Sequence, residues 1–339
     1  MHLKKLLITS TIIASTSISN NTVADIKVSG EQEWNYLDAG GSFKSTLGSS
    51  TSFTFTGTGD LSNGISYLVK FTLEDGDQSY RAITFDLGSG LKLGIGYDQS
   101  YGIETVKAIS PYVNNRRADI TGAHRGLPTA ARKPLGPDVW DTSSGENAIG
   151  LSFKNDLAAI SFGFTPVRDV NTSTDAIATS SATSSEYGTA SSIGVKLTPV
   201  DGLTIGFGTS SEESDATANS DPKGTTIGFQ YKIGSFAIGY QEIENIIDSA
   251  SSTEDSVEIQ EGGVAYKVND ALTIGVFAAN INYLTVNTDN GVETGMGIVQ
   301  IGYNLGPAVI QYDYADGSDL NSTKDTEYEI HKVKIKVLF

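Results

Sequence analysis

The chain has 339 residues, a formal net charge of -17 at pH 7, three histidines and no cysteine. The lack of cysteine excludes disulfides, thiolate metal sites and a cysteine nucleophile, and it leaves the redox compartment open. The acidic balance argues against a nucleic-acid partner, and no uninterrupted apolar run reaches the length of a transmembrane helix.

The first 24 residues have the pattern of a secretory signal peptide. A charged start ("MHLKK") precedes a moderately apolar segment at 6–18, and small residues come before a cleavage point after Ala24. The alternatives are an N-terminal core helix or a membrane anchor, but the apolar segment is short and rich in Ser and Thr. We expect cleavage after Ala24, which leaves residues 25–339 as the mature domain.

Alternation of apolar and polar residues is the dominant signal in the mature domain. It is plain in "STSFTFTGTG" (50–59), "GISYLVKFTLE" (64–74) and "GLKLGIGYD" (90–98). Because successive side chains of a strand point to opposite faces, each segment has one apolar face and one face of small or polar residues. The same pattern predicts about sixteen strands, near 25–36, 50–59, 64–74, 79–88, 90–98, 146–155, 157–166, 188–198, 202–210, 224–233, 235–243, 257–268, 271–283, 292–304, 307–316 and 326–339.

The connections between these strands fall into two sets that alternate along the chain. One set is short and rich in turn-forming residues, at 61–64, 88–90, 155–156, 199–202, 233–235, 268–270 and 305–307. The other set is mostly longer and polar, at 37–49, 75–78, 99–145, 167–187, 211–223, 244–256, 284–291 and 317–325. This succession places both termini at the same end of an antiparallel meander.

These patterns predict an all-β fold: a transmembrane antiparallel up-and-down β-barrel of about sixteen strands. A soluble β-sandwich also alternates, but here no second set of apolar faces exists to cover the first. Strands of about ten residues, tilted by about 45°, match the apolar band of an outer membrane. Closure leaves no unpaired strand edge in lipid. Aromatic residues near several strand ends are typical of interface girdles, although strands favour aromatics in general.

The last predicted strand, "EIHKVKIKVLF", alternates and ends on Phe339. It resembles the C-terminal assembly signal of Gram-negative outer-membrane proteins, where a final aromatic residue is recognised by the insertion machinery. With the signal peptide, the strand count and one exceptionally long third loop, residues 25–339 resemble the general, non-specific porins, nearer to the alphaproteobacterial and betaproteobacterial type than to the enterobacterial one. The enterobacterial loop signature Pro-Glu-Phe-Gly-Gly is absent, so no constriction residues are carried over from the family.

The resemblance implies a homotrimer in the bacterial outer membrane, in contact with membrane lipid and lipopolysaccharide. It implies a water-filled channel for passive diffusion of ions and small hydrophilic solutes, with a third loop folded into the lumen. Diffusion through such a channel needs no covalent chemistry and no cofactor, so we expect no enzyme activity, no cofactor and no metal. The resemblance also implies assembly through the insertion machinery, which would recognise Phe339.

The third loop, 99–145, contains the basic stretch "NNRRADITGAHRGLPTAARK" (114–133). A free loop of this length is unusual, and its apolar residues favour burial against a wall. We therefore expect it in the lumen, where a narrow, charged constriction sets ion preference and basic residues favour anions. The predicted constriction residues are Arg116, Arg117, Asp119, Arg125, Arg132 and Lys133. The alternative is a solvated external loop near lipopolysaccharide phosphates.

Lysines at inward positions of the predicted strands would add to the field of the lumen. Lysine facing lipid at mid-depth costs about 2–4 kcal/mol, which favours the inward orientation. The predicted pore-wall lysines are Lys27, Lys70, Lys92, Lys332, Lys334 and Lys336. Acids at inward positions, which would give the field a transverse component, are Glu31, Glu33, Glu74, Asp86 and Asp313.

Other functions have less support in the sequence. A substrate-specific channel, the nearest alternative, would need an aromatic stripe in the lumen, but most aromatic residues have outward positions. A barrel enzyme would need a catalytic group of residues that the sequence does not offer. A secreted adhesin with a soluble β-sandwich is a third alternative. Acidic loops such as "EDGD" (74–77) fall short of a twelve-residue calcium loop.

Overall fold

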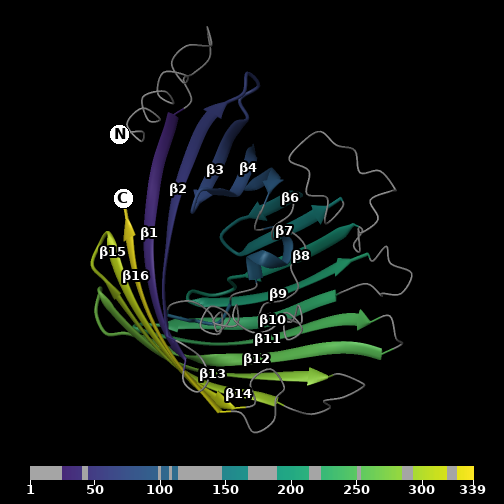
Figure 1. Ribbon diagram of the computed structural model, residues 1–339. Coiled ribbons are helices and arrows are strands. Elements are labelled where there is room, and N and C mark those ends of the chain that lie inside the picture. Colours follow the sequence, from purple (N-terminus) through teal and green to yellow (C-terminus); the bar gives the residue numbers. More distant parts are fainter. Residues whose placement is uncertain are drawn as a thin grey trace.

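Sixteen antiparallel strands, each hydrogen-bonded to its neighbours in the chain, close into a barrel when the first strand pairs with the last (Figure 1). The computed structural model describes residues 25–39, 45–97, 101–106, 109–113, 147–166, 189–213, 223–249, 253–284, 293–318 and 327–339. The strands are β1 (Asp25–Ala39), β2 (Thr46–Asp60), β3 (Ser66–Glu74), β4 (Asp77–Gly88), β5 (Leu91–Tyr97), β6 (Asn147–Lys154), β7 (Ala158–Thr165), β8 (Ala190–Leu197), β9 (Leu203–Glu212), β10 (Lys223–Ile233), β11 (Phe236–Ser249), β12 (Thr253–Lys267), β13 (Leu272–Leu284), β14 (Glu293–Asn304), β15 (Ala308–Ser318) and β16 (Glu327–Leu338).

The barrel confirms the predicted fold, and every predicted strand is present. Several strands run further toward the long loops than the alternation indicated. The clearest case is the β11–β12 hairpin, where pairing continues to Ser249 opposite Thr253, inside the segment expected to be a loop. Polar side chains there end the apolar pattern, but the backbone hydrogen bonds continue.

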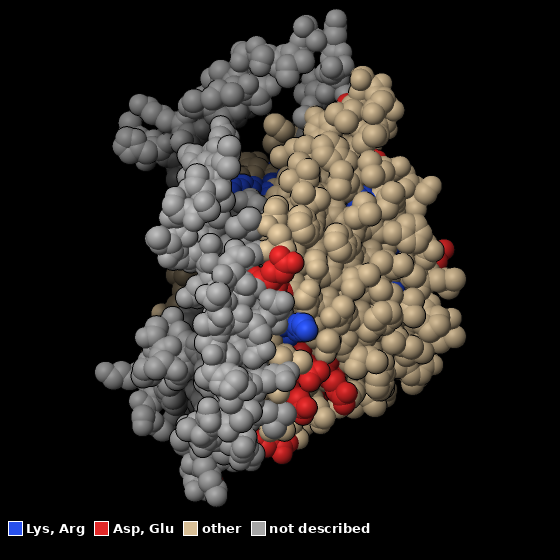
Figure 2. Space-filling view, turned by 90° about the vertical axis from the view of Figure 1, so that its right-hand side faces the viewer, with Lys and Arg blue, Asp and Glu red and all other residues tan. Residues whose placement is uncertain are grey.

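The two faces of the wall follow the predicted alternation, as β10 shows. Ile227 and Phe229 are exposed on the outer face, whereas Gly224, Thr226 and Gly228 are buried on the inner face. Exposed apolar side chains on the outside of a closed barrel are what a hydrocarbon environment favours. Figure 2 shows one side of the molecule, on which the described surface is largely uncharged and acidic side chains gather along its border with the grey residues. No helix among the described residues has the length and apolar character to cross a membrane.

Contacts on both faces hold the seam between β1 and β16. In the backbone ladder, the Gly30 amide donates to the Phe339 carbonyl at 2.7 Å, and the Phe339 amide donates to the Gly30 carbonyl at 3.0 Å. The Phe339 ring occupies the space that a side chain at position 30 would need, and it lies edge-on to Phe53 at 5.9 Å. Inside, two ion pairs join β16 to β1: Lys334 with Glu33 at 2.9 Å, and Lys336 with Glu31 at 2.8 Å.

Replacing Gly30 with valine tests whether the packing of the Phe339 ring over Gly30 stabilises the seam. We expect Gly30→Val to displace the ring and lower the free energy of unfolding by about 1–3 kcal/mol, the usual cost of overpacking. The matched control is Gly57→Val on the outer face of neighbouring β2, where an added Cβ meets no atom within 4 Å. Heat-induced conversion of the folded band on detergent gels measures the difference. Equal transition temperatures for the two variants would show that packing of the Phe339 ring over Gly30 does not stabilise the seam.

Candidate functional site

The start of the long third loop lies against the inner wall of the barrel (Figure 1). After β5 the chain forms a short 3-10 helix, η1 (Gly102–Val106), which packs on β7, β8 and β9. Ile103 and Val106 are fully buried, and Ile109 is nearly so. They form an apolar cluster with Ile243 of β11 and Ile259 of β12. The loop therefore crosses the lumen side of several strands before the basic stretch begins.

Inward-facing glycines make room for this crossing. Tyr101 fills the space that side chains at Gly94 of β5 and Gly150 of β6 would occupy. A Cβ added at Gly206 of β9 would lie 2.6 Å from Ile109 Cδ1, and one at Gly239 of β11 would lie 2.6 Å from Pro111 Cδ. Glycine is thus needed on these strands because another segment approaches the backbone closely.

Gln241 of β11 satisfies the polar backbone of the loop where it leaves η1. The Ile109 amide donates to Gln241 Oε1 at 3.0 Å, and Gln241 Nε2 donates to the Val106 carbonyl at 3.0 Å. Nε2 also donates to Thr226 Oγ1 at 2.8 Å, which fixes the amide orientation. The side chain is fully buried. Since buried backbone groups need hydrogen-bond partners, Gln241 joins the loop to the wall by satisfying both of these groups.

A second anchor holds the loop at residues 112–113. The Val113 amide donates to Gln300 Oε1 of β14 at 3.0 Å. The Tyr112 ring stacks on Phe277 at a centroid distance of 4.5 Å, and its hydroxyl donates to Glu261 Oε2 at 3.2 Å. At the other end, Tyr101 lies against Gly94 of β5 and Gly150 of β6. The loop is therefore fixed to the wall from β6 as far as β14.

The predicted constriction residues, Arg116, Arg117, Asp119, Arg125, Arg132 and Lys133, lie outside the described residues. The last described residue before them is Val113, which is held on the inner wall by Gln300. The chain therefore lies on the inner wall at the residue that immediately precedes the basic stretch. Its position beyond that point stays a prediction.

The structure places the six predicted wall lysines on the inner face: Lys27, Lys70, Lys92, Lys332, Lys334 and Lys336. Lys70 Nζ lies 4.5 Å from the centroid of the Tyr80 ring. Lys334 and Lys336 are ion-paired across the seam. In register, Lys92 lies opposite Asp86, and Lys332 lies opposite the buried Asp313. Several of these lysines therefore lie next to acidic side chains. Their part in ion selection stays a prediction.

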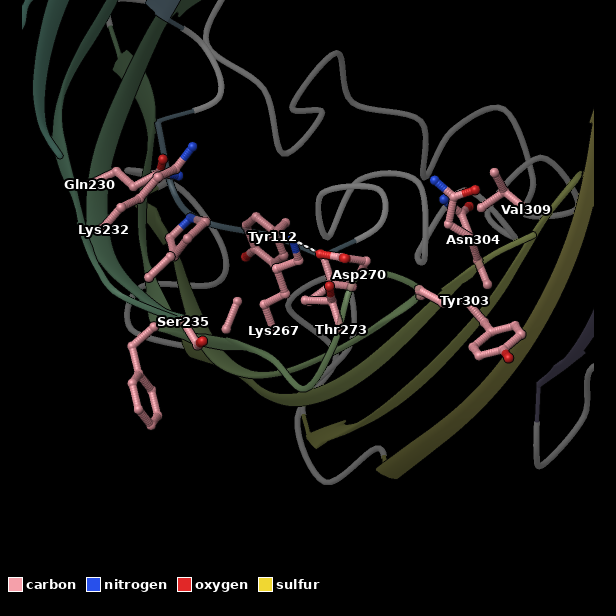
Figure 3. Close-up of a pocket in the computed structure, with 18 of the residues that line it drawn as sticks. Tyr112, Gln230, Lys232, Ser235, Lys267, Asp270, Thr273, Tyr303, Asn304 and Val309 are labelled. Carbon is pink, nitrogen blue, oxygen red and sulfur yellow. Dashed lines mark hydrogen bonds and ion pairs between the residues drawn. The ribbon is translucent and has the colours of Figure 1, made fainter. Parts of the chain in front are cut away.

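Sequence reasoning missed a second set of inward-facing lysines near the short turns. They are Lys154, Lys196, Lys232 and Lys267. Lys232 and Lys267 line a pocket of about 490 Å³ beneath Pro111–Val113 (Figure 3). Asp270, in the turn, pairs with Lys267 at 2.8 Å, and this hydrogen bond and charge lower the pKa of its carboxyl. The inward/outward count that identified Lys92 would have found all four.

Comparison with known proteins identifies this arrangement of wall and loop. A family model described as Gram-negative porin matches residues 9–320. The chain belongs to the Gram-negative porin family. No curated protein matches its sequence.

Solved porin structures share the fold at low sequence identity. A porin refined at 1.8 Å resolution matches with a TM-score of 0.66 and 14% identity, covering 93% of this chain and 100% of that chain. In vitro folded OmpT of Vibrio cholerae matches with a TM-score of 0.67 and 11% identity, covering 96% and 100%. An anion-selective porin from Comamonas acidovorans matches with a TM-score of 0.65 and 13% identity, covering 93% and 100%. This porin is thus an outer-membrane channel for passive diffusion, and the lumen is its functional site.

Removing the side-chain amide of Gln241 tests whether its hydrogen bonds hold the loop against the wall. In Gln241→Leu the Ile109 amide and the Val106 carbonyl lose their partners, at about 1–3 kcal/mol for each group left unsatisfied. We expect the start of the loop to leave the wall, which raises single-channel conductance and admits larger sugars in liposome swelling. Gln260→Leu is the control, since Gln260 is exposed on the outer face of β12. A folded Gln241→Leu channel with unchanged conductance and size limit would contradict this role.

Proposed function

We propose that this porin is a non-specific channel in which loop 99–145 narrows the lumen and its basic residues make the pore anion-leaning. The observation that carries the proposal is the anchoring of Tyr112 and Val113 to the inner wall by Glu261, Gln300 and Phe277. The basic stretch follows Val113 immediately in the sequence, which supports placing its arginines in the lumen. A narrow aqueous passage with low-dielectric walls concentrates their field.

The ion pairs at the seam support assigning the anion preference to the loop rather than to the lysines of β16. The lysine ladder of β16 is largely compensated, because Lys334 and Lys336 pair with Glu33 and Glu31. A compensated pair contributes little net potential to a passing ion. The similarity to a Comamonas acidovorans porin described as anion-selective points the same way.

The assembly that we propose is a homotrimer, surrounded by outer-membrane lipid and lipopolysaccharide. A Vibrio cholerae OmpT structure of the same fold is described as a trimer form. We further propose that residues 1–24 are removed as a signal peptide and that the insertion machinery recognises Phe339. Diffusion through the lumen requires no covalent chemistry, so we propose neither enzyme activity nor a cofactor.

Planar bilayers test the role of the loop arginines. We expect ohmic conductance steps, and a reversal potential in a potassium chloride gradient that is displaced toward the chloride equilibrium potential. Arg116→Ala combined with Arg117→Ala should move the reversal potential toward zero, because two positive charges leave the narrowest part of the pore. Lys223→Ala on the outer face of β10 is the control and should change nothing. Unchanged selectivity in the arginine variant would place the basic cluster outside the pore, and a mature protein that leaves membranes impermeable would overturn the channel itself.

A further inference from the structure

Four of the inward-facing lysines near the short-turn end of the barrel lie on alternate strands, at the ends where these strands enter short turns. They are Lys154 of β6, Lys196 of β8, Lys232 of β10 and Lys267 of β12, and we name them the lysine rim. Lys154 and Lys267 are the last residues of their strands, and Lys196 and Lys232 are the last but one. All four therefore sit at one end of the lumen, away from the long loops.

The strand register brings members of the lysine rim together. Lys154 and Lys196 both lie opposite Ala159 of β7, so they occupy one row across three strands, about 10 Å apart at two strand spacings. Lys232 and Lys267 share the pocket beneath the loop, where Figure 3 shows both with Gln230 and Thr273 around the same space. The rim thus combines cationic groups with neutral polar ones.

Among the described residues, most of these lysines have no ion-pair partner. Lys267 pairs with Asp270, whereas Lys154, Lys196 and Lys232 form no ion pair within the part of the chain that the structure describes. Asp156 and Asp201 are also at this end, but they are exposed in the turns. The seam lysines differ, since each of the pairs there joins a lysine to a glutamate. The rim is therefore a local source of positive potential in a chain of net charge -17.

We propose that the lysine rim is an anion-binding vestibule that collects small multivalent anions carrying phosphate or carboxylate groups at the short-turn mouth. The inference rests on the proposed channel function but not on the arginines of the loop. Lysine ammonium groups bind phosphate as point charges, and a confined lumen strengthens their field over that of an open surface. A divalent anion gains twice the electrostatic energy of chloride in the same field, so the rim favours multivalent solutes.

The absence of cysteine from the chain allows a direct measurement of the potential at the rim. Ser235→Cys places one thiol in the pocket that Lys232 and Lys267 line. Charged methanethiosulfonate reagents of opposite sign report the local field through their relative reaction rates. We expect the ratio of the anionic to the cationic rate, divided by the same ratio for a free thiol, to be roughly ten, which corresponds to a potential of about one kT per unit charge because the two reagents respond with opposite sign.

The matched comparison uses two lysines of the same strand. Lys232→Gln in the Ser235→Cys background should reduce the rate ratio about two- to threefold, since one of several nearby charges is removed. Lys223→Gln removes the same charge from the outer face at the other end of β10 and should leave the ratio unchanged. Millimolar inorganic phosphate on the short-turn side should reduce chloride current more than phosphate on the loop side.

The outcomes separate this proposal from the channel function. Normal conductance with equal rates for the two reagents, or with a ratio that Lys232→Gln does not change, overturns the vestibule and leaves the channel intact. Equal effects of phosphate from both sides also overturn it. Absence of conductance in the parent protein would instead overturn the channel. A ratio that falls with Lys232→Gln and not with Lys223→Gln supports the lysine rim.

Discussion

Hydrocarbon offers no partner to a backbone N–H or C=O group, so a wall of strands in a membrane must satisfy all of them internally. In this porin the pairing of β1 with β16 completes that condition and leaves no edge. The exchange of hydrogen bonds between Gly30 and Phe339 extends the ladder to the last residue. Because the seam also carries two inward ion pairs, closure fixes part of the charge of the lumen at the same time.

The same requirement governs the loop that enters the barrel. Its backbone loses water when it lies against the wall, and wall side chains replace that water: Gln241 bonds both Ile109 and Val106, and Gln300 bonds Val113. Glycines provide the space and these amides provide the partners. The inner face is therefore two surfaces, one that holds the loop and one that remains open to solute.

The alternation of residues predicted the sixteen strands because the side chains that face lipid are mainly apolar, and this requirement applies to each strand separately. The sequence did not predict the full length of β11 and β12. Backbone pairing between these strands continues as far as Ser249 opposite Thr253, beyond the point where the apolar alternation ends. The inward burial of Ile243 and Ile259 was also missed. Their partners, Ile103, Val106 and Ile109, are more than a hundred residues away in the sequence. A pattern of neighbouring residues cannot predict a contact over that separation. The alternation was enough to predict that the wall lysines face inward. Which acid each lysine pairs with depends on the register between neighbouring strands, which the sequence does not show.

Net charge alone gives a poor account of what an ion meets in this channel. The chain is strongly acidic, yet its inward lysines differ in their pairing: Lys334 and Lys336 at the seam pair with glutamates, whereas three of the four in the lysine rim have no ion pair among the described residues. Potential in the lumen depends on uncompensated charge close to the path, because screening in the aqueous parts limits each charge to about 8–10 Å. If the loop arginines also lie in the lumen, an anion meets two separate basic zones, one at the short-turn mouth and one at the constriction. Passage then depends on weak binding at successive sites, which keeps entry favourable without trapping the solute.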